Sequence, residues 1–353
     1  MSDLQISLLG IGVAVIVAVY LYNLWLERQY KRHYGDAFRR REDALYHGTQ
    51  SAHFETLTEV VETAKPAPAE KVRGNVANEA CELLDEATDF IVEIYPIGLV
   101  GADALQPLWQ RRFDFGKNVN ACGLLAESGS WEKVIAESHV TYSAFRMGLQ
   151  LSNRSGAVNL ARLSDFSDLA REIGAQLQAD FTIPDAEEAA ARAIELDAFC
   201  AELDQMIGLN LLPNGEITLG ANEVAEVMQA AGMKLQADGA FHLPDAQGHT
   251  IFSVCNVENN PFQHHTFNHM RVKGLTLLLD VPRVEHPVRR FDEMVTFANM
   301  LGKELGATVV DDHKAILKES GLAQIREQIE LIETRMQAAN IEPGSAQARR
   351  LFS

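Results

Sequence analysis

Three histidines lie close together in the stretch PFQHHTFNHM. His265 and His269 have the i, i+4 spacing that places two imidazoles on one face of a helix, where they can bind a metal ion, and His264 is beside them. However, Pro261 opens the stretch, no strong helix signal follows, and no carboxylate or cysteine stands at ligand spacing. The sequence therefore favours an exposed polar loop over a metal site, and we expect no metal.

Adjacent carboxylates are the other residues that could do chemistry. Asp311 and Asp312 suggest acid–base catalysis, but neighbouring residues of a strand point to opposite faces, so we interpret them as a turn. The chain contains no GxSxG, HExxH, Walker A or glycine-rich dinucleotide motif. We therefore expect a protein that is not an enzyme and uses no cofactor.

The chain has four cysteines, which are widely spaced and form no CxxC pair. This spacing is typical of unpaired buried thiols in a reducing compartment rather than of a disulfide framework or a zinc site. The four residues are Cys81, Cys122, Cys200 and Cys255.

Composition excludes further classes of protein. The 353 residues are 47% hydrophobic and 23% charged, which is typical of globular proteins with a buried core. The net charge of −18 disfavours nucleic-acid binding, because a basic surface is needed to displace counterions from phosphates. We expect no nucleic-acid partner.

The N-terminal stretch has the length and composition of a membrane span. Residues 7–26 form a run of twenty positions without a charge, enough for a helix to cross about 30 Å of hydrocarbon. A cleaved signal peptide would need a basic start, a shorter apolar run and a small-residue cleavage site, and a helix of the soluble core is rarely apolar all round. Basic residues follow the run and none precedes it: Arg28, Lys31, Arg32, Arg39, Arg40 and Arg41.

This charge asymmetry predicts the orientation of the span. Basic residues favour the cytoplasmic side, so residues 1–6 form a short periplasmic end and everything after residue 26 is cytoplasmic. The sequence thus predicts a single-pass protein of the bacterial inner membrane. Residues 27–87 then form a basic juxtamembrane segment and linker.

The remaining sequence contains one pattern twice, which we name the first repeat (88–204) and the second repeat (205–339), followed by a tail (340–353). Each repeat opens with a short apolar strand, continues with a helix and extended runs, and closes with a helix, a short strand and a long helix. This order predicts the α+β class: two split β-α-β-like domains, each an antiparallel sheet with helices on one face. The best-matched stretches of the two repeats are LAREIGAQL and FANMLGKEL.

Three stretches of the second repeat are similar to a known family. They are IFSVCNVEN at Ile251–Asn259, GLTLLLDVPR at Gly274–Arg283 and VVDDHKAILKESGLAQIREQI at Val309–Ile329. Together with the N-terminal span and its basic flank, they resemble the ZipA family of bacterial cell division proteins. That family usually has a longer linker and a single such domain, so the first repeat is a departure, here treated as a degenerate copy.

The resemblance implies a partner and a site. In the ZipA family, one face of this sheet binds the C-terminal peptide of FtsZ through apolar side chains. Strand alternation puts Leu277 with the core-facing residues and Leu278 on the opposite, solvent-facing side. The residues predicted to bind the peptide are Met206, Gly208, Ala240, Cys255, Val257, Thr276 and Leu278.

Together, these features predict a membrane-anchored cell division adaptor that binds FtsZ and tethers the division ring. The alternative is a membrane-tethered sensor that binds a small ligand within or between the two α+β repeats.

Overall fold

The computed structural model describes residue 81 and residues 83–215, 217–311 and 314–353. All of them fall within one unit, Lys71–Ser353. The predicted span at 7–26 and nearly all of the segment 27–87 lie outside the described residues. Among the residues that are described, no helix combines the length and apolar content needed to cross a bilayer.

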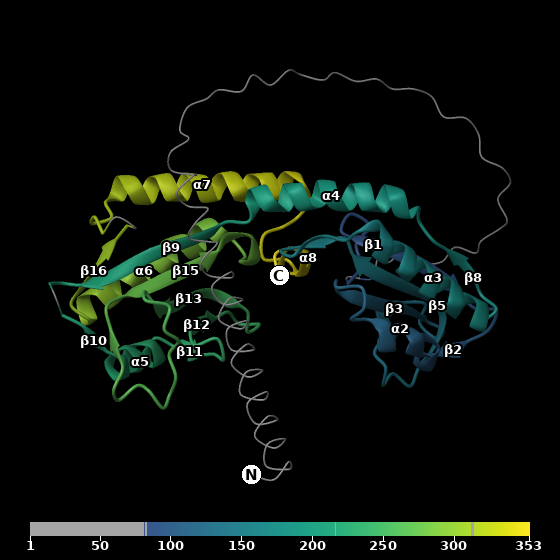
Figure 1. Cartoon of the computed structure of the whole chain (residues 1–353), viewed down its shortest axis with the longest axis horizontal. Coiled ribbons are helices and arrows are strands. Elements are labelled where there is room, and N and C mark those ends of the chain that lie inside the picture. Colours follow the sequence, from purple (N-terminus) through teal and green to yellow (C-terminus); the bar gives the residue numbers. More distant parts are fainter. Residues whose placement is uncertain (1–80, 82, 216, 312–313) are drawn as a thin grey trace, which may run out of the picture. The chain divides into compact units, whose positions relative to one another are not determined.

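The first repeat, drawn in blue to teal in Figure 1, contains one main sheet and two long helices. The helical elements are η1 (Ala102–Leu105), α2 (Gln106–Arg111), α3 (Leu160–Gln176) and α4 (Ala186–Leu203). The strands of the main sheet are β1 (Asp89–Tyr95), β2 (Val100–Gly101), β3 (Val119–Leu125), β4 (Trp131–Lys133), β5 (Thr141–Gln150) and β8 (Asp180–Thr182). A small hairpin pairs β6 (Ser152–Asn153) with β7 (Gly156–Ala157).

The second repeat contains a sheet of similar layout. Its helical elements are α5 (Ala221–Ala230), η2 (Val281–Arg283), α6 (Pro287–Glu304) and α7 (Glu319–Ala338). Its main strands are β9 (Met206–Pro213), β11 (Lys234–Leu235), β12 (Phe241–Pro244), β13 (Thr250–Asn256), β15 (Leu275–Asp280) and β16 (Ala307–Val310). A separate pair joins β10 (Leu219–Gly220) to β14 (Arg271–Val272).

The described structure is mixed α and β with antiparallel sheets and helices, as predicted. The central strands follow the order β3-β5-β1-β8 in the first repeat and β13-β15-β9-β16 in the second. The edges differ, because β4 follows β3 along the chain whereas β12 precedes β13. The matching central order supports the repeat pattern, while the domain boundaries and an origin by duplication stay predictions.

Each sheet buries alternate side chains against its helices. In β1, Phe90, Val92 and Ile94 are fully buried, and Phe90 makes an edge contact with Phe166 of α3 at 6.2 Å between ring centroids. In the second repeat, α6 packs against β9, β13 and β15. This period-two burial is the pattern that strand geometry imposes. In the second repeat, alternation predicts that Ile207, Leu209, Leu211 and Leu277 face the core, and all four lie in its core cluster.

The sequence predicts that the first repeat closes with a long helix at Ala186–Leu203, and α4 has these bounds. Asp185 has extended backbone geometry, and its side chain accepts hydrogen bonds from the backbone N–H groups of Glu187 and Glu188 at 2.9 Å. An aspartate at this position satisfies donors that the first helical turn leaves without partners. The negative charges of Glu187 and Glu188 in that turn also oppose the positive end of the helix dipole.

The C-terminal residues are ordered as part of the second repeat rather than as a simple tail. Ser345 caps the short helix α8 (Ala346–Leu351), drawn in yellow in Figure 1. Ile341, Leu351 and Phe352 are buried in the same hydrophobic cluster as the core of the second repeat. The sequence did not predict this helix, because six residues are too few to show a helical period.

The prediction of four unpaired cysteines is wrong for two of them. Cys81 and Cys122 form a disulfide, with their Cα atoms 6.4 Å apart and 41 positions apart in the sequence. Cys200 and Cys255 are free, as predicted. Spacing alone could not reveal the pair, because β3 and the segment before β1 meet only in the folded chain.

Candidate functional site

The candidate site is the sheet face of the second repeat that points away from its helices, which we name the second outer face. In β9, Ile207, Leu209 and Leu211 belong to the hydrophobic core, so strand alternation turns Met206 and Gly208 to the outer face. Directly paired residues of neighbouring strands share a face, so the strand register identifies the other members of the surface.

One row of paired residues crosses the middle of this face. Gly208 of β9 is opposite Leu278 of β15, which is opposite Ser253 of β13, which is opposite His242 of β12. Because Gly208 has no side chain, the flank of Leu278 nearest β9 is not covered by a cross-strand neighbour. The row therefore contains one large apolar side chain between two small residues.

The next row is held by polar contacts within the sheet. Asn210, Thr276 and Cys255 are paired across β9, β15 and β13. The Thr276 hydroxyl donates to Oδ1 of Asn210 at 2.8 Å, and Sγ of Cys255 lies 3.6 Å from the carbonyl oxygen of Thr276. These hydrogen bonds give buried polar atoms partners within the sheet. A bound peptide would therefore not need to supply hydrogen bonds to these atoms.

The structure corrects the exposure of three predicted site residues. Ala240, Thr276 and Leu278 are buried, with exposed fractions of 3%, 2% and 8%. Thr276 and Leu278 belong to β15, which lies between β13 and β9, so side chains of both neighbouring strands help to bury them. Strand alternation predicts only the face to which a side chain points, and not how far its neighbours cover it. Leu278 is nevertheless absent from the core cluster that contains Leu277, in agreement with its opposite orientation.

The other four predicted residues, Met206, Gly208, Cys255 and Val257, are half-buried. Met206 lies opposite Asp280 at one end of the face. At the other end Val257 follows β13, and its backbone N–H donates to the carbonyl of Gly274 at 3.1 Å. The register therefore places predicted site residues on one face, although whether they bind a partner stays a prediction.

A histidine and an aspartate on the same face were missed by the sequence reasoning. Nε2 of His242 lies 2.9 Å from Oδ2 of Asp238, and Nδ1 lies 3.1 Å from the hydroxyl of Thr250. Burial alone would raise the pKa of Asp238, but hydrogen bonds from His242 and from the N–H of Ala240 outweigh it and lower that pKa. The strand alternation that selected Leu278 also predicts His242, because Phe241 beside it is a core residue.

The free thiol on this face, Cys255, has a raised pKa. Burial, with a smaller effect from the negative charge of Asp238, raises the pKa of the Cys255 thiol to about 12. A thiol with that pKa is almost wholly protonated at neutral pH, and the thiolate is the nucleophilic form. Cys255 therefore contributes a small neutral surface rather than a catalytic group.

The other residues considered for chemistry form no site in the described structure. Residues 264–269 are turns rather than a helix, and His264 contacts the ring of Phe267. Within residues 81, 83–215, 217–311 and 314–353, no group of His, Cys, Asp and Glu side chains is arranged to hold a metal ion. Oδ1 of Asp311 accepts from the backbone N–H of Ala315 at 2.8 Å, as in the predicted turn, and Asp312 lies outside the described residues.

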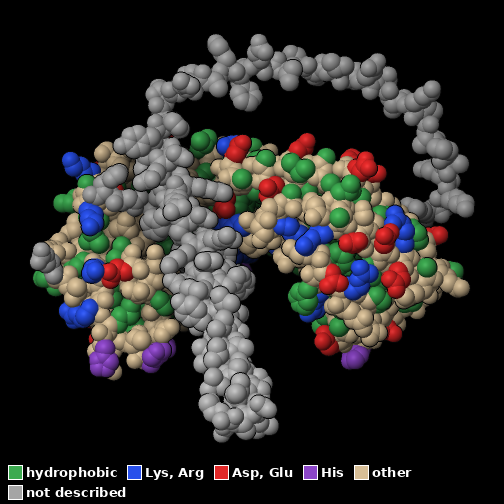
Figure 2. Space-filling view, in the orientation of Figure 1, with side chains coloured by type: hydrophobic (Ala, Val, Ile, Leu, Met, Phe, Trp, Pro, Cys, Tyr) green, Lys and Arg blue, Asp and Glu red, His purple; other side chains and the backbone are tan. Residues whose placement is uncertain are grey.

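The visible surface carries charges of both signs. Figure 2 shows Lys and Arg side chains interspersed with Asp and Glu over the described part of the molecule. This mixture accompanies a net charge of −18 for the whole chain.

Comparisons with known proteins agree with the resemblance seen in the sequence. Residues 205–328 match the family described as ZipA, C-terminal FtsZ-binding domain. A protein named Cell division protein ZipA from Ectopseudomonas mendocina is 20% identical over 157 residues, which cover 43% of this chain and 58% of that protein. Its namesake from Colwellia psychrerythraea is 25% identical over 170 residues, or 43% of this chain and 41% of the relative.

A third relative extends the same result. Cell division protein ZipA from Vibrio campbellii is 24% identical over 129 residues, or 35% of this chain and 40% of that protein. The chain thus spans between 40% and 58% of the length of these relatives. The ZipA family consists of non-enzymatic cell division adaptors, which agrees with the expectation that this protein is not an enzyme. These matches confirm the resemblance to the ZipA family, and the family match places it in the second repeat, at residues 205–328.

Proposed function

We propose that this protein is a non-catalytic, membrane-anchored cell division adaptor that binds the C-terminal peptide of FtsZ on the second outer face. The observation that carries the proposal is the match of residues 205–328 to an FtsZ-binding domain, in which register gathers the predicted site residues on one sheet face. Anchoring through residues 7–26 would then connect FtsZ polymers to the inner membrane.

The chemistry of the face suits an apolar peptide. A helix that lays its apolar side on a shallow groove binds chiefly through a few anchor side chains. Leu278 forms the floor of the face between Gly208 and Ser253, and Met206 and Val257 provide half-exposed apolar contacts at the ends. The polar atoms of Thr276 already have partners within the sheet, so covering them does not break a bond to water.

Replacing Met206 with glutamate tests this assignment. Met206 is half-buried and lies outside the core cluster, so the change leaves no core cavity, and circular dichroism checks that the new carboxylate opposite Asp280 leaves the protein folded. A charge placed under an apolar peptide should weaken its binding about tenfold or more, which corresponds to at least about 1.4 kcal/mol. Fluorescence anisotropy of a labelled FtsZ C-terminal peptide, titrated with the full chain in detergent micelles, measures the change.

A matched control adds the same charge elsewhere. Gln229 is exposed on α5, so Gln229→Glu should leave the affinity within about twofold of wild type. Equal affinity of Met206→Glu and wild type, with both proteins folded, would contradict the assignment of the site. Absence of any peptide binding by the wild type would contradict the proposed function and favour the small-ligand sensor.

The proposed anchor has its own test. The basic residues that follow the apolar run, with none before it, predict that the C-terminus is cytoplasmic. Alkaline phosphatase, which is active only in the periplasm, should be inactive when fused after Ser353, whereas a cytoplasmically active reporter at the same position should be active. The reverse result would place the second repeat on the side of the membrane away from FtsZ.

A further inference from the structure

The first repeat has an outer face that corresponds to the second one position by position. Ile91 of β1 pairs with Gly148 of β5, in the places that Gly208 and Leu278 occupy in the second repeat. In the first repeat the large residue is on β1 and the glycine is on β5. In the second repeat the glycine is on β9 and the large residue is on β15. The row beside them also corresponds: Glu93, Arg146 and Cys122 in the first repeat, and Asn210, Thr276 and Cys255 in the second.

A segment of the chain itself covers this first outer face. We name Cys81 and residues 83–88, which the structure describes, the clasp. Cys81 and Leu84 of the clasp are buried with Cys122 in a small hydrophobic cluster that is separate from the main core of the first repeat. Ile91 and Trp131 pack against this cluster.

Leu84 occupies the position directly above Gly148. A Cβ atom added at Gly148 would lie only 2.3 Å from Cδ2 of Leu84, so a side chain at position 148 would force the Leu84 side chain to move. Cys81 is joined to Cys122 on the same face. The equivalent positions in the second repeat hold Leu278 and the free thiol of Cys255.

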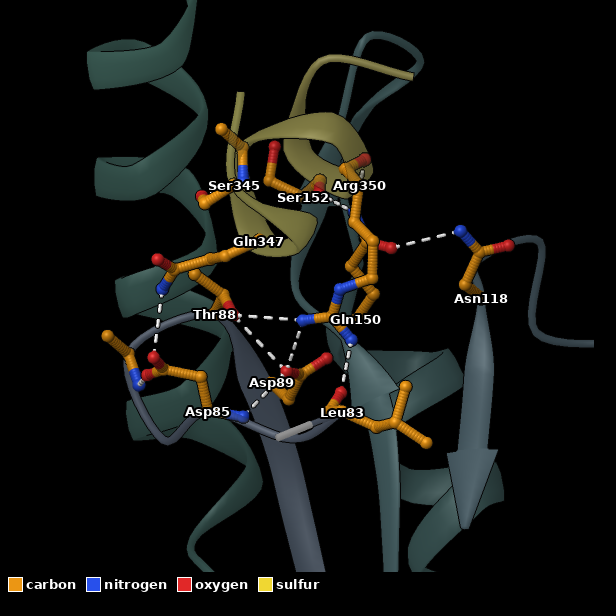
Figure 3. Close-up of polar contacts among 12 residues, drawn as sticks. Leu83, Asp85, Thr88, Asp89, Asn118, Gln150, Ser152, Ser345, Gln347 and Arg350 are labelled. Carbon is orange, nitrogen blue, oxygen red and sulfur yellow. Dashed lines mark hydrogen bonds and ion pairs between the residues drawn. The ribbon is translucent and has the colours of Figure 1, made fainter. Parts of the chain in front are cut away.

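The C-terminal helix α8 holds the clasp from its other side (Figure 3). Arg350 donates to the carbonyl oxygen of Leu83 at 2.7 Å and to the hydroxyl of Thr88 at 3.2 Å. The same guanidinium forms an ion pair with Asp89 at 2.6 Å, and Nε2 of Gln347 donates to Oδ2 of Asp85 at 2.9 Å. Leu83, Asp85 and Thr88 of the clasp are therefore bonded to side chains of α8.

We infer that the clasp is a built-in occupant of the first outer face, so that each chain offers a single site to the FtsZ peptide. This inference rests on the proposed function of the second outer face and specifies its stoichiometry. The clasp provides apolar contacts from Leu84 where a peptide would otherwise insert its own side chains.

The closure does not depend on the disulfide. Thiols are kept reduced in the bacterial cytoplasm, where the proposed topology places this region. The packing of Leu84 over Gly148 and the hydrogen bonds of Arg350 and Gln347 are independent of the redox state. The face is therefore closed in the reduced protein as well as in the oxidised one.

Titration calorimetry of the full chain in detergent micelles with the FtsZ C-terminal peptide tests the number of sites. We expect one peptide per chain, with and without a dithiol reductant. Two peptides per chain would overturn the inference while leaving the proposed function intact. No binding at all would contradict the proposed function, and the state of the clasp is then decided by the next measurement, which uses no peptide.

Alkylation of Cys122 reports directly on the clasp. A full-length variant with Cys81, Cys200 and Cys255 changed to serine keeps Cys122 as its sole thiol. In this background Cys122 should react with iodoacetamide at least about tenfold more slowly than after denaturation, because opening must precede reaction. Leu84→Ser should raise the native rate about tenfold or more, since each tenfold corresponds to about 1.4 kcal/mol of opening free energy.

The control for this experiment is Glu86→Ala. Glu86 belongs to the clasp but its side chain is exposed, so this change should leave the alkylation rate of Cys122 within about twofold. Native Cys122 reacting as fast as the denatured thiol, or responding equally to Leu84→Ser and Glu86→Ala, would show that the clasp does not close the face.

Discussion

Leu277→Ala is expected to lower the free energy of unfolding by about 2–5 kcal/mol, because it leaves a cavity in the core of the second repeat. Leu277 is fully buried in the cluster formed by β9, β13, β15 and α6. Leu278→Ala should cost less than Leu277→Ala, since Leu278 is 8% exposed and lies outside the core cluster on the helix side of the sheet. Urea unfolding of the two variants, followed by circular dichroism, measures the difference.

Binding should rank the same two variants in the opposite order. Leu278 forms the floor of the second outer face, so Leu278→Ala should weaken the FtsZ peptide about tenfold. Leu277→Ala, measured at a temperature where the protein stays folded, should bind nearly as well as wild type. If Leu277→Ala weakens peptide binding as much as Leu278→Ala, the assignment of opposite faces to these neighbours fails.

Arg350→Ala is expected to destabilise the chain by about 3–5 kcal/mol, because it leaves the carboxylate of Asp89 buried without its charged partner. Asp89 is 1% exposed, and its Oδ2 atom also accepts from the N–H of Asp85 and the hydroxyl of Thr88. The side chain of Arg350 is itself only 18% exposed, so solvent screens this pair little. Thermal or urea unfolding of the full chain measures the loss.

Two controls distinguish the cost of leaving the Asp89 charge unpaired from the cost of losing the contacts of the Arg350 side chain. Arg171 pairs with Asp168 at an exposed site, so Arg171→Ala should cost no more than about 1 kcal/mol. Adding Asp89→Asn to Arg350→Ala removes the unpaired charge and should recover part of the stability. A loss for Arg350→Ala no larger than that for Arg171→Ala would contradict the structural role of this ion pair.

Arg154, in the turn between β6 and β7, is a second arginine whose guanidinium binds carboxylates far away in the sequence. Its guanidinium donates to Asp204, the last residue of the first repeat, at 2.6 Å and to Asp280 of β15 in the second repeat at 2.9 Å. Burial raises the pKa of Asp280, and the nearby charge of Arg154 only partly opposes that rise. The pKa of Arg154 is raised, because its bonds to both carboxylates outweigh burial. Asp280 is the last residue of β15 and lies opposite Met206 at one end of the second outer face. The ion pair between Arg154 and Asp280 therefore lies at the end of the proposed site.

Short-range sequence patterns determined much of the second repeat. Alternation assigned Ile207, Leu209 and Leu211 to the core. The family-like stretch from Val309 to Ile329 lies, except for its last residue, within residues 205–328, which match the ZipA C-terminal domain. These features depend on residues a few positions apart, where the period of a strand or a helix directly relates sequence to geometry.

The features that only the tertiary structure decided join residues far apart in the chain. Arg350 and Asp89 are separated by 261 positions, and Cys81 and Cys122 by 41, so no local period relates either pair. Burial of Leu278 likewise depends on the strands on either side of β15, whereas alternation gives only the face to which a side chain points. The sequence alone thus predicted the orientation of the side chains, and their shielding followed from which distant segments pack over them.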